Sequence, residues 1–563
     1  MLRKWGCLGA VLLGAIILAV MATTPPAPRG MDTPAGEFSS ARAMEDVRII
    51  AAKPHPTGSA ENAKVRTYLK ARMQALGLEV SESRSALEQG YLDRLNAWSG
   101  EAKTSQEIVN IIGILRGTDS SKPALLLMAH HDTVWGSPGA ADDTIGIASI
   151  FEIIRALNND DAERPRDIIV LLTDAEEIGL VGARHFFAKN PLADRIGAVI
   201  NFEARGGGGT ANMFQTSAEN GEVARVFARA VKQPSVSSLS VFIYNVLPND
   251  TDLTPALKRD YAAYNIANIG RAEQYHSPAS DADGLGENTL QHMGSQGLDL
   301  TRALAAAEGL PAKKTDAVFF DVFGLFTVFY APIWGWLFLL AAVILYAASI
   351  KREPKPEAIL SGALKMLGFL VIGAGLLYGF NALSIKGSSA DYYDRLAAIP
   401  QLTWLALIVS VTVFAALFGQ RPLSANERFG VMLPLLSLGL IGQALAPTAS
   451  YFIVLALLLC GIAAFALSRA GGKPFGPIIA AVTAILVIAY MIMLGHLLML
   501  GVGPNVPSVA ILPASLAVMA LLPLYPGLPK KWNKAVGGAG LVLATVLALW
   551  VRLDPIAATV PLY

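Results

Sequence analysis

Histidine and carboxylate side chains gather in five segments of the first 300 residues, and four of these segments directly follow an apolar, strand-like run. The segments are His130-His131-Asp132, Asp142-Asp143, Asp174-Ala175-Glu176-Glu177, Glu203 and Glu273-Gln274-Tyr275-His276. Neutral imidazole and carboxylate are the ligands that zinc accepts where thiolates are absent. The two cysteines, Cys7 and Cys460, lie in apolar runs, which excludes a cysteine-based zinc site and a disulfide framework. The residue types therefore indicate metal chemistry.

A hydrolytic site with a pair of metal ions makes a further demand on these residues. It needs about five protein ligands, a carboxylate or water shared by the ions, and one carboxylate left free as general base. The adjacent Glu176 and Glu177 suit this division, because one can bind metal while the other faces the water. Each motif alone also has a plainer explanation, as polar residues that end a strand, a helix N-cap or acids in a first helical turn.

The spacing of apolar residues predicts the elements that position these groups. Between about residues 35 and 312, short apolar runs such as 124–129 alternate with amphipathic stretches such as 144–157. This alternation predicts an α/β domain with a mixed, mostly parallel sheet flanked by helices. Groups at the carboxyl ends of such strands lie where α/β sheets present functional residues.

The rest of the chain differs from this domain in composition. The whole chain has a mean hydropathy of +0.46 and only 16% charged residues, which is low for a soluble protein. An apolar run within residues 1–25 predicts a signal anchor or a cleavable signal peptide, and residues 316–563 predict an all-α transmembrane domain with about eight helices. Lys365 and His496 are ionisable groups inside these apolar segments, and the sequence identifies no partner for either.

The charges are distributed unevenly along the chain. The net charge is +1, which offers no support for nucleic-acid binding, but residues 351–563 carry 14 basic and 6 acidic side chains. With the N-terminus inside, the connections on the cytoplasmic side hold twelve Lys and Arg residues against three on the other side. We therefore expect a multi-pass membrane protein in contact with lipid, with residues 35–312 on the extracytoplasmic (periplasmic or lumenal) side.

The ordered motifs HHD, GAADD, DAEEIGLVGA, NFEARG and YHSPASD resemble those of the co-catalytic zinc exopeptidases of family M-28, chiefly aminopeptidases. The resemblance covers roughly residues 45–300, and the ordered set is specific although each motif alone is weak. With its anchor and apolar C-terminal half, the whole chain is similar to the membrane-bound branch, the vacuolar membrane proteases and endoplasmic-reticulum metallopeptidases. The resemblance implies a zinc aminopeptidase-like fold and two zinc ions per chain.

The resemblance also implies a role for individual residues. The implied zinc ligands are His130, Asp142, Glu177, Glu203 and His276. Asp142 would bridge both ions, Glu176 would be the general base, and Asp132 would orient His130. Many soluble relatives have Asp where this chain has Glu203. Because glutamate has a longer side chain, the distance between the two metal ions is in doubt. Asn249 and Asp250 belong to a loop that resembles a substrate-lining segment, and Arg205 is a candidate for binding a substrate carboxylate.

The expected function is that of an aminopeptidase that removes N-terminal residues from peptides with a zinc-activated water. The alternatives are a carboxypeptidase or single-zinc glutaminyl cyclase on the same scaffold, and a non-catalytic transporter or membrane-assembly module. An intact general base and ligand set favours an enzyme. The sequence leaves open the preferred peptide, the oligomeric state and the host membrane.

Overall fold

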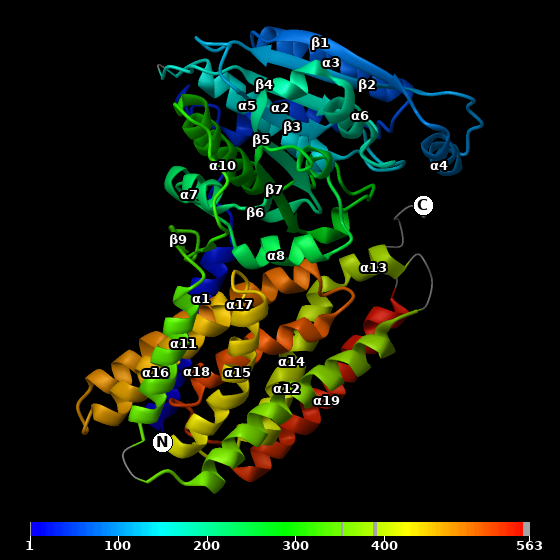
Figure 1. Cartoon of the computed structure of the whole chain (residues 1–563). Coiled ribbons are helices and arrows are strands. Elements are labelled where there is room, and N and C mark those ends of the chain that lie inside the picture. The colour runs from blue at the N-terminus through cyan, green and yellow to red at the C-terminus, as the bar shows by residue number, and fades with distance from the viewer. Residues whose placement is uncertain (1, 161, 351–352, 387–390, 555–563) are drawn as a thin grey trace. The chain divides into compact units, whose positions relative to one another are not determined.

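The computed structural model describes residues 2–160, 162–350, 353–386 and 391–554 (Figure 1). These residues form two compact units. Among the described residues, the α/β unit comprises Thr24–Phe329, and the helical unit combines residues 2–23 with residues 330–554.

A seven-stranded sheet forms the centre of the α/β unit. Its spatial order is β1-β2-β4-β3-β5-β7-β6. The strands are β1 (Glu79–Ala86), β2 (Glu107–Leu115), β3 (Ala124–His130), β4 (Ile168–Thr173), β5 (Ile196–Ala204), β6 (Gly208–Thr216) and β7 (Ala262–Gly270). The four central strands, β4, β3, β5 and β7, are parallel, and the outer strands pair antiparallel. The predicted mixed, mostly parallel sheet is therefore confirmed.

Helices cover both faces of the sheet and bury its central strands. The helices of the α/β unit are α2 (Ser40–Ile50), α3 (Ala60–Ala75), α4 (Gln89–Ser99), α5 (Ile145–Leu157), α6 (Val181–Lys189), α7 (Gly221–Ala230), α8 (Ser238–Val246), α9 (Leu253–Ala256) and α10 (Glu287–Ala306). In β3, Leu125 and Leu127 pack with α2, α5 and α10, whereas Leu126 and Met128 pack with α6 and α9. Burial on both faces explains why these strands appear in the sequence as continuous apolar runs. A separate hairpin, β8 (Val318–Asp321) and β9 (Thr327–Tyr330), follows α10.

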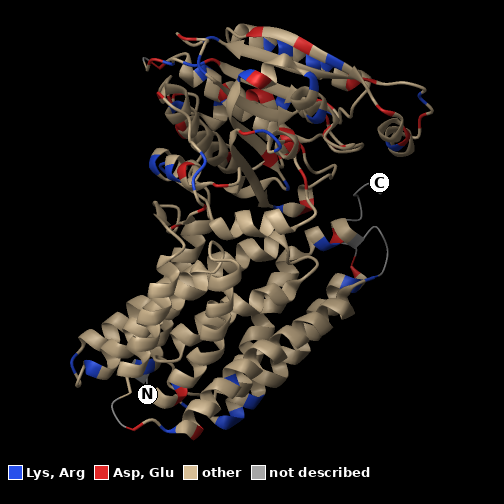
Figure 2. Cartoon of the chain, viewed as in Figure 1, with Lys and Arg blue, Asp and Glu red and all other residues tan. Residues whose placement is uncertain are grey.

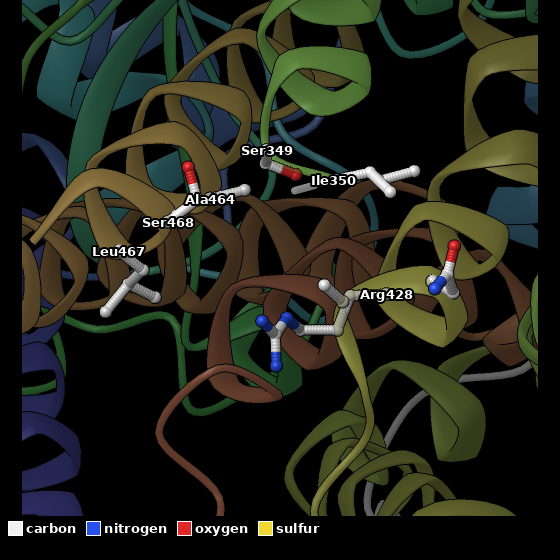
Figure 3. Close-up of a pocket in the computed structure, with 8 residues that line it drawn as sticks. Ser349, Ile350, Arg428, Ala464, Leu467 and Ser468 are labelled. Atoms are coloured by element: carbon white, nitrogen blue, oxygen red, sulfur yellow. The ribbon is translucent and has the colours of Figure 1, made fainter. Parts of the chain in front are cut away.

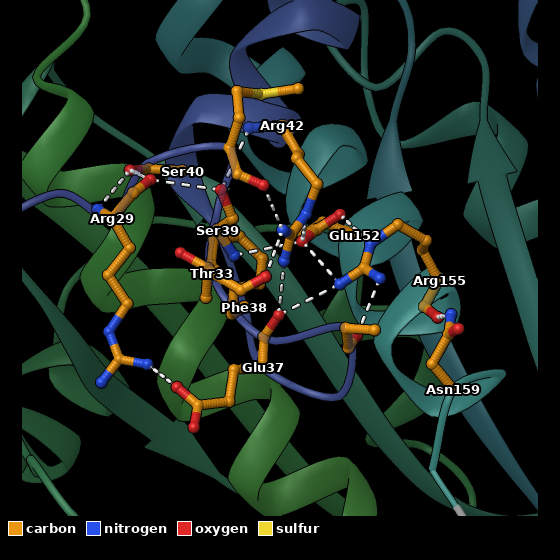
Figure 4. A network of polar contacts seen from close by, with 12 residues as sticks. Arg29, Thr33, Glu37, Phe38, Ser39, Ser40, Arg42, Glu152, Arg155 and Asn159 are labelled. Carbon is orange, nitrogen blue, oxygen red and sulfur yellow. Dashed lines mark hydrogen bonds and ion pairs between the residues drawn. The ribbon is translucent and has the colours of Figure 1, made fainter.

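A buried glutamate ties the N-terminal segment of the α/β unit to α5 (Figure 4). Glu152 on α5 is 1% exposed and pairs with Arg42 at 2.9 Å and with Arg155 at 2.6 Å. Its carboxylate also accepts a hydrogen bond from the backbone N–H of Ser39, the N-cap of α2. Arg155 in turn donates to the carbonyl of Ala35. Residues 35–42 are therefore fixed to the helix that follows the Asp142-Asp143 turn.

The helical unit contains seven helices that are long and apolar enough to cross a membrane, counted over the described residues. They are α1 (Leu2–Thr23), α12 (Pro356–Ser384), α14 (Ile399–Phe418), α15 (Ala425–Leu445), α16 (Tyr451–Arg469), α17 (Phe475–Gly501) and α19 (Lys530–Leu553). Two shorter apolar helices, α11 (Trp334–Ala348) and α18 (Ile511–Leu521), and a short α13 (Asp391–Ala397) accompany them. The helical C-terminal region agrees with the sequence prediction.

Lys365 has a partner that the sequence did not identify. Its Nζ lies 3.3 Å from Glu427 Oε1, and Arg421 pairs with the same carboxylate at 2.6 Å. Glu427 is separated from Lys365 by 62 residues and belongs to another helix, so periodicity within one segment cannot reveal the pair.

We predict that Glu152→Ala destabilises the α/β unit by about 3 kcal/mol, because two largely buried guanidinium groups lose their shared carboxylate. Thermal unfolding of the purified full-length protein would measure this loss. The control is Glu61→Ala, which removes an exposed ion pair with Lys64 on α3 and should barely change the transition. Equal transitions in the two variants would contradict the prediction.

Candidate metal centre

The candidate ligands lie at the carboxyl edge of the parallel strands. His130 is the last residue of β3, and Glu203 is the last but one of β5. Glu176 and Glu177 follow β4 in the turn before α6, and His276 follows β7 after a short 3₁₀ turn. Strand ends converge at this edge while helices cover the faces, so side chains distant in sequence meet there.

Asp142 lies between the two histidines. It belongs to the segment Ala140–Thr144 that leads into α5; its own backbone is non-helical, with φ of −111° and ψ of 95°, and its peptide bond to Asp143 is cis. Asp142 Oδ1 is 2.9 Å from His130 Nε2, and its Oδ2 is 3.2 Å from His276 Nε2. Glu177 Oε2 lies 3.1 Å from the same nitrogen of His276. The two oxygens of one carboxylate therefore face two different imidazoles.

The five predicted ligands form two triplets that share Asp142. One triplet is His130, Asp142 and Glu203, and the other is Asp142, Glu177 and His276. Within each triplet, one candidate ligand atom per residue lies within 4.8 Å of the others. Atoms bound to one tetrahedral zinc are about 3.3 Å apart, given bonds of about 2.0–2.2 Å. Small side-chain adjustments would bring each triplet to that spacing.

Unsatisfied carboxylate oxygens test whether these residues suit a cation. Glu177 Oε1 and Glu203 Oε1 are buried and have no hydrogen-bond partner among the residues that the structure describes. A buried carboxylate oxygen without a partner is unfavourable, and a divalent cation removes that penalty directly. The nitrogen and oxygen donors are the types that zinc binds. The site residues therefore fit a zinc centre.

The electrostatics of the cluster lead to the same conclusion. Burial raises the pKa of Glu203 well above its ordinary value; nearby Asp143 and Asp142 raise it further, and His130 opposes them. Asp142 behaves differently: although burial opposes ionisation, hydrogen bonds from His130 and His276 hold its pKa well below the usual range. The cluster thus contains more negative charge than its two histidines can neutralise, which favours a bound cation.

Glu176 stands beside the two triplets. One of its carboxylate oxygens lies within 4.8 Å of candidate ligand atoms of His130 and Glu177. Burial raises its pKa well above the ordinary value, with contributions from the carboxylates of Glu203 and Glu177. A carboxyl group with a raised pKa is suited to accept and then release a proton near neutral pH.

The contacts of Asp132 differ in part from the predicted ones. His130 Nδ1 is 2.9 Å from the main-chain oxygen of Asp132 but 3.7 Å from its carboxylate, which is too long for a hydrogen bond. The carboxylate instead accepts hydrogen bonds from the backbone N–H groups of Glu176, at 3.0 Å, and Glu177, at 3.3 Å. Asp132 therefore contacts His130 mainly through its backbone, and its side chain positions the two glutamates.

His131 and Asp143, the second residues of the His130-His131 and Asp142-Asp143 pairs, lie outside the ligand triplets. His131 Nε2 is 3.0 Å from the backbone oxygen of Val109 on β2, the strand beyond β4. Asp143 accepts hydrogen bonds from the backbone N–H groups of His130 and Gly146, so it caps the start of α5. Both residues hold the backbone in place and are absent from the ligand triplets.

The three predicted substrate-binding residues are not part of the cluster. Asn249 and Asp250 are exposed, and the Asp250 carboxylate accepts a hydrogen bond from the Thr254 hydroxyl. Arg205 is half-buried just beyond β5, where its backbone N–H donates to the carbonyl of Asn268. Neither triplet includes any of them.

Two residues that the sequence did not single out lie near the carboxylates. Asp252 is 1% exposed, accepts a hydrogen bond from the Thr173 hydroxyl at the end of β4, and raises the pKa of Glu176. Tyr244 on α8 has a buried hydroxyl, and burial together with the charge of Glu203 raises its pKa. Asp252 belongs to the same loop as Asn249 and Asp250, which the sequence did indicate, but the sequence did not show which of the two aspartates is buried.

We predict a pH-dependent stability of the metal-free protein that involves Asp252. Burial raises the pKa of Asp252 to about 6. Because this value exceeds that of the unfolded chain, the carboxyl stabilises the fold below about pH 4, and that contribution is lost as the pH rises through about 6.

Thermal unfolding between about pH 4 and 7 should therefore show a smaller decline for Asp252→Asn than for the unaltered chain. Asp250→Asn, in the same loop but exposed, should behave like the unaltered chain. An identical decline in all three proteins would refute the role of Asp252.

Comparison with known proteins identifies relatives of this chain. Residues 110–301 match the profile of the family described as Peptidase family M28. The chain is 28% identical over 396 residues to endoplasmic reticulum metallopeptidase 1 of Homo sapiens, covering 65% of this chain and 43% of that protein. It is 30% identical over 295 residues to vacuolar membrane protease of Eremothecium gossypii, covering 50% of this chain and 29% of that protein. The chain thus spans less than half the length of these relatives.

Solved structures give a weaker likeness. A zinc aminopeptidase from Bacillus subtilis aligns with 50% of this chain and 98% of its own, at 16% identity and a TM-score of 0.39. A glutaminyl cyclase from Porphyromonas gingivalis aligns with 47% of this chain and 97% of its own, at 21% identity and a TM-score of 0.37. The matched segment and the membrane-protein relatives confirm the resemblance seen in the motifs: residues 110–301 of this chain belong to peptidase family M28.

Proposed function

We propose that this protein is a membrane-anchored zinc exopeptidase, and specifically an aminopeptidase with two zinc ions that hydrolyses N-terminal residues from peptides. The observation that carries the proposal is the pair of triplets that share Asp142, with Glu176 beside them. A module that only binds its partner has no need for a free carboxylate next to two complete ligand sets. This arrangement therefore favours catalysis over a transport or assembly role.

Each residue of the cluster has a distinct task in the proposed reaction. His130, Asp142 and Glu203 would hold one zinc ion, and Asp142, Glu177 and His276 the other. When bound, zinc polarises the scissile carbonyl and lowers the pKa of water. Glu176, whose carboxylate lies beside His130 and Glu177, takes a proton from the attacking water and delivers it to the leaving amine.

Neighbouring residues position these groups. The Asp132 carboxylate fixes the backbone of Glu176 and Glu177, so a shift of Asp132 would move the base and a ligand together. The Tyr244 hydroxyl is a buried donor, and the charge of Glu203 acts on it. We assign it to the carbonyl oxygen of the substrate, where negative charge develops.

The proposed location is an integral membrane protein with its peptidase domain on the extracytoplasmic side. The support is the excess of twelve over three Lys and Arg residues between the two sets of connections. A peptide substrate and surrounding lipid are the proposed partners. The helical unit would keep the enzyme at the membrane surface.

We predict that Glu176→Gln lowers peptide hydrolysis by about a thousandfold or more while zinc stays bound, because the ligands are intact and only the base is lost. The assay compares peptides with free and acetylated N-termini on the full-length protein. Glu273→Gln, an exposed change three residues before His276, is the matched control and should leave turnover unaltered.

Retained turnover in Glu176→Gln would remove the assignment of the base. Preferential cleavage of acetylated peptides from their carboxyl end would replace the aminopeptidase by a carboxypeptidase. Cyclisation of N-terminal glutamine without hydrolysis would indicate a glutaminyl cyclase.

A second prediction concerns metal content. Elemental analysis of the unaltered protein should find two zinc ions per chain, and Asp142→Asn should retain at most one with weak affinity, because both triplets lose a carboxylate. Asp143→Asn changes the adjacent residue but neither triplet, and should keep both ions. One tightly bound ion in the unaltered protein would refute the two-zinc proposal.

A further inference from the structure

A cavity opens in the helical unit where three helices end or begin (Figure 3). Its volume is about 320 Å³, which lies at the lower end of the range of ligand pockets, about 300–1,000 Å³. It lies between the end of α11, the first turn of α15 and the end of α16. The lining residues that matter here are Ser349, Ile350, Asn426, Arg428, Leu467 and Ser468.

Arg428 is the one charged residue among the described residues that line the cavity, and no acidic side chain is among them. One Nη1 hydrogen bond, 2.8 Å long, joins its guanidinium to the carbonyl of Leu423, and no other hydrogen bond of this side chain occurs within the described residues. Figure 3 shows the side chain extending away from α15, toward the side of the cavity where Leu467 lies. The other N–H groups of this guanidinium have no protein acceptor among the described residues, and the side chain lines the cavity.

The nearest acid is already occupied by other cations. Glu427 pairs with Arg421 at 2.6 Å and with Lys365 at 3.3 Å, and it also accepts a hydrogen bond from the backbone N–H of Ser424. The single negative charge of Glu427 is thus already shared by the two positive charges of Arg421 and Lys365. The positive charge of Arg428 therefore lacks a local counter-ion within the described part of the helical unit.

The lining also contains an amide donor and apolar side chains. The Asn426 side-chain oxygen accepts a hydrogen bond from the backbone N–H of Lys355, which orients the amide NH₂ as the end available for other contacts. Ile350 and Leu467 supply apolar surface. A guanidinium and an amide donor beside apolar side chains match an anion attached to a hydrocarbon or glycerol group.

The cavity also lies at the basic end of the helical unit. Figure 2 shows that Lys and Arg residues of this unit concentrate toward the end where α12, α15 and α19 begin. Arg469 and Lys473, at and beyond the end of α16, belong to the same end. Such a surface raises the local concentration of anions and of anionic lipid.

From these observations we propose that the cavity around Arg428 is a binding site for a phosphate group, such as the headgroup phosphate of an anionic phospholipid. The guanidinium donates to the phosphate oxygens and the Asn426 amide donates beside it. The apolar walls contact the rest of the ligand. This site is separate from the metal centre, and its occupancy does not depend on the proposed peptidase activity.

The experiment titrates the purified full-length protein in detergent and follows thermal unfolding. The three probes are short-chain phosphatidylglycerol, short-chain phosphatidylcholine, and sodium phosphate against sodium chloride of equal ionic strength. We expect phosphatidylglycerol to raise the transition temperature more than phosphatidylcholine. In Arg428→Gln the half-saturating concentration should rise about tenfold, because a charge-assisted contact is lost.

Arg469→Gln is the matched control. It removes the same charge at the same end of the unit, but Arg469 is exposed, lies over the Phe465 ring and does not line the cavity. Its titration should equal that of the unaltered protein. Ser468→Leu keeps Arg428 but fills part of the cavity, and it should weaken binding as Arg428→Gln does. This second variant tests the proposal if Arg428→Gln fails to fold.

The outcomes separate the two sources of phosphate. A response to inorganic phosphate that depends on Arg428 and matches that to phosphatidylglycerol supports the site with free phosphate as its ligand. A response to phosphatidylglycerol alone supports the lipid headgroup. Equal weakening in Arg428→Gln and Arg469→Gln, or unaltered binding in Ser468→Leu, would overturn the proposal.

Discussion

Several carboxylates meet at one buried edge of a parallel sheet, and their mutual repulsion is the constraint on which the α/β unit depends. Burial disfavours the charged form of each group, and neighbouring acids disfavour it further. The two histidines offset only part of this repulsion between carboxylates, because both of them contact the same carboxylate, that of Asp142. A divalent cation in each triplet converts the repulsion into binding energy, so metal affinity and stability of this edge are linked.

Such a site needs a rigid frame, because ligands that could relax apart would lose their affinity for the metal. His130 and Glu203 lie on buried strands and cannot move far. The turn with Glu176 and Glu177 has no such support and is held by hydrogen bonds to Asp132, at the end of the neighbouring strand. Glu152 plays a similar part at longer range by anchoring α5, the helix that starts at the Asp142 turn.

The sequence contained enough information to predict the architecture, since apolar runs that end in His or carboxylate groups predict parallel strands with a site at their carboxyl edge. The motif order was specific enough to identify the family. Individual contacts were less predictable. Asp250 and Asp252 are two residues apart in one loop, and only the packing against β4 decides that Asp252 is the buried one. The contact of His130 with the Asp132 backbone, and that of Lys365 with Glu427, likewise depend on geometry that residue types do not encode.

The same physical rule applies to both units, although the unbalanced charge is negative at the metal centre and positive at Arg428. A buried or half-buried charge is stable only with a counter-charge or with donors and acceptors in place of water. In the helical unit, Glu427 meets this requirement for Lys365 and Arg421. Arg428 exceeds what that one carboxylate can neutralise, just as the acids of the metal centre exceed what two histidines can. An unbalanced charge beside a cavity is therefore informative in both units, because its sign specifies the charge of the ligand that would complete it.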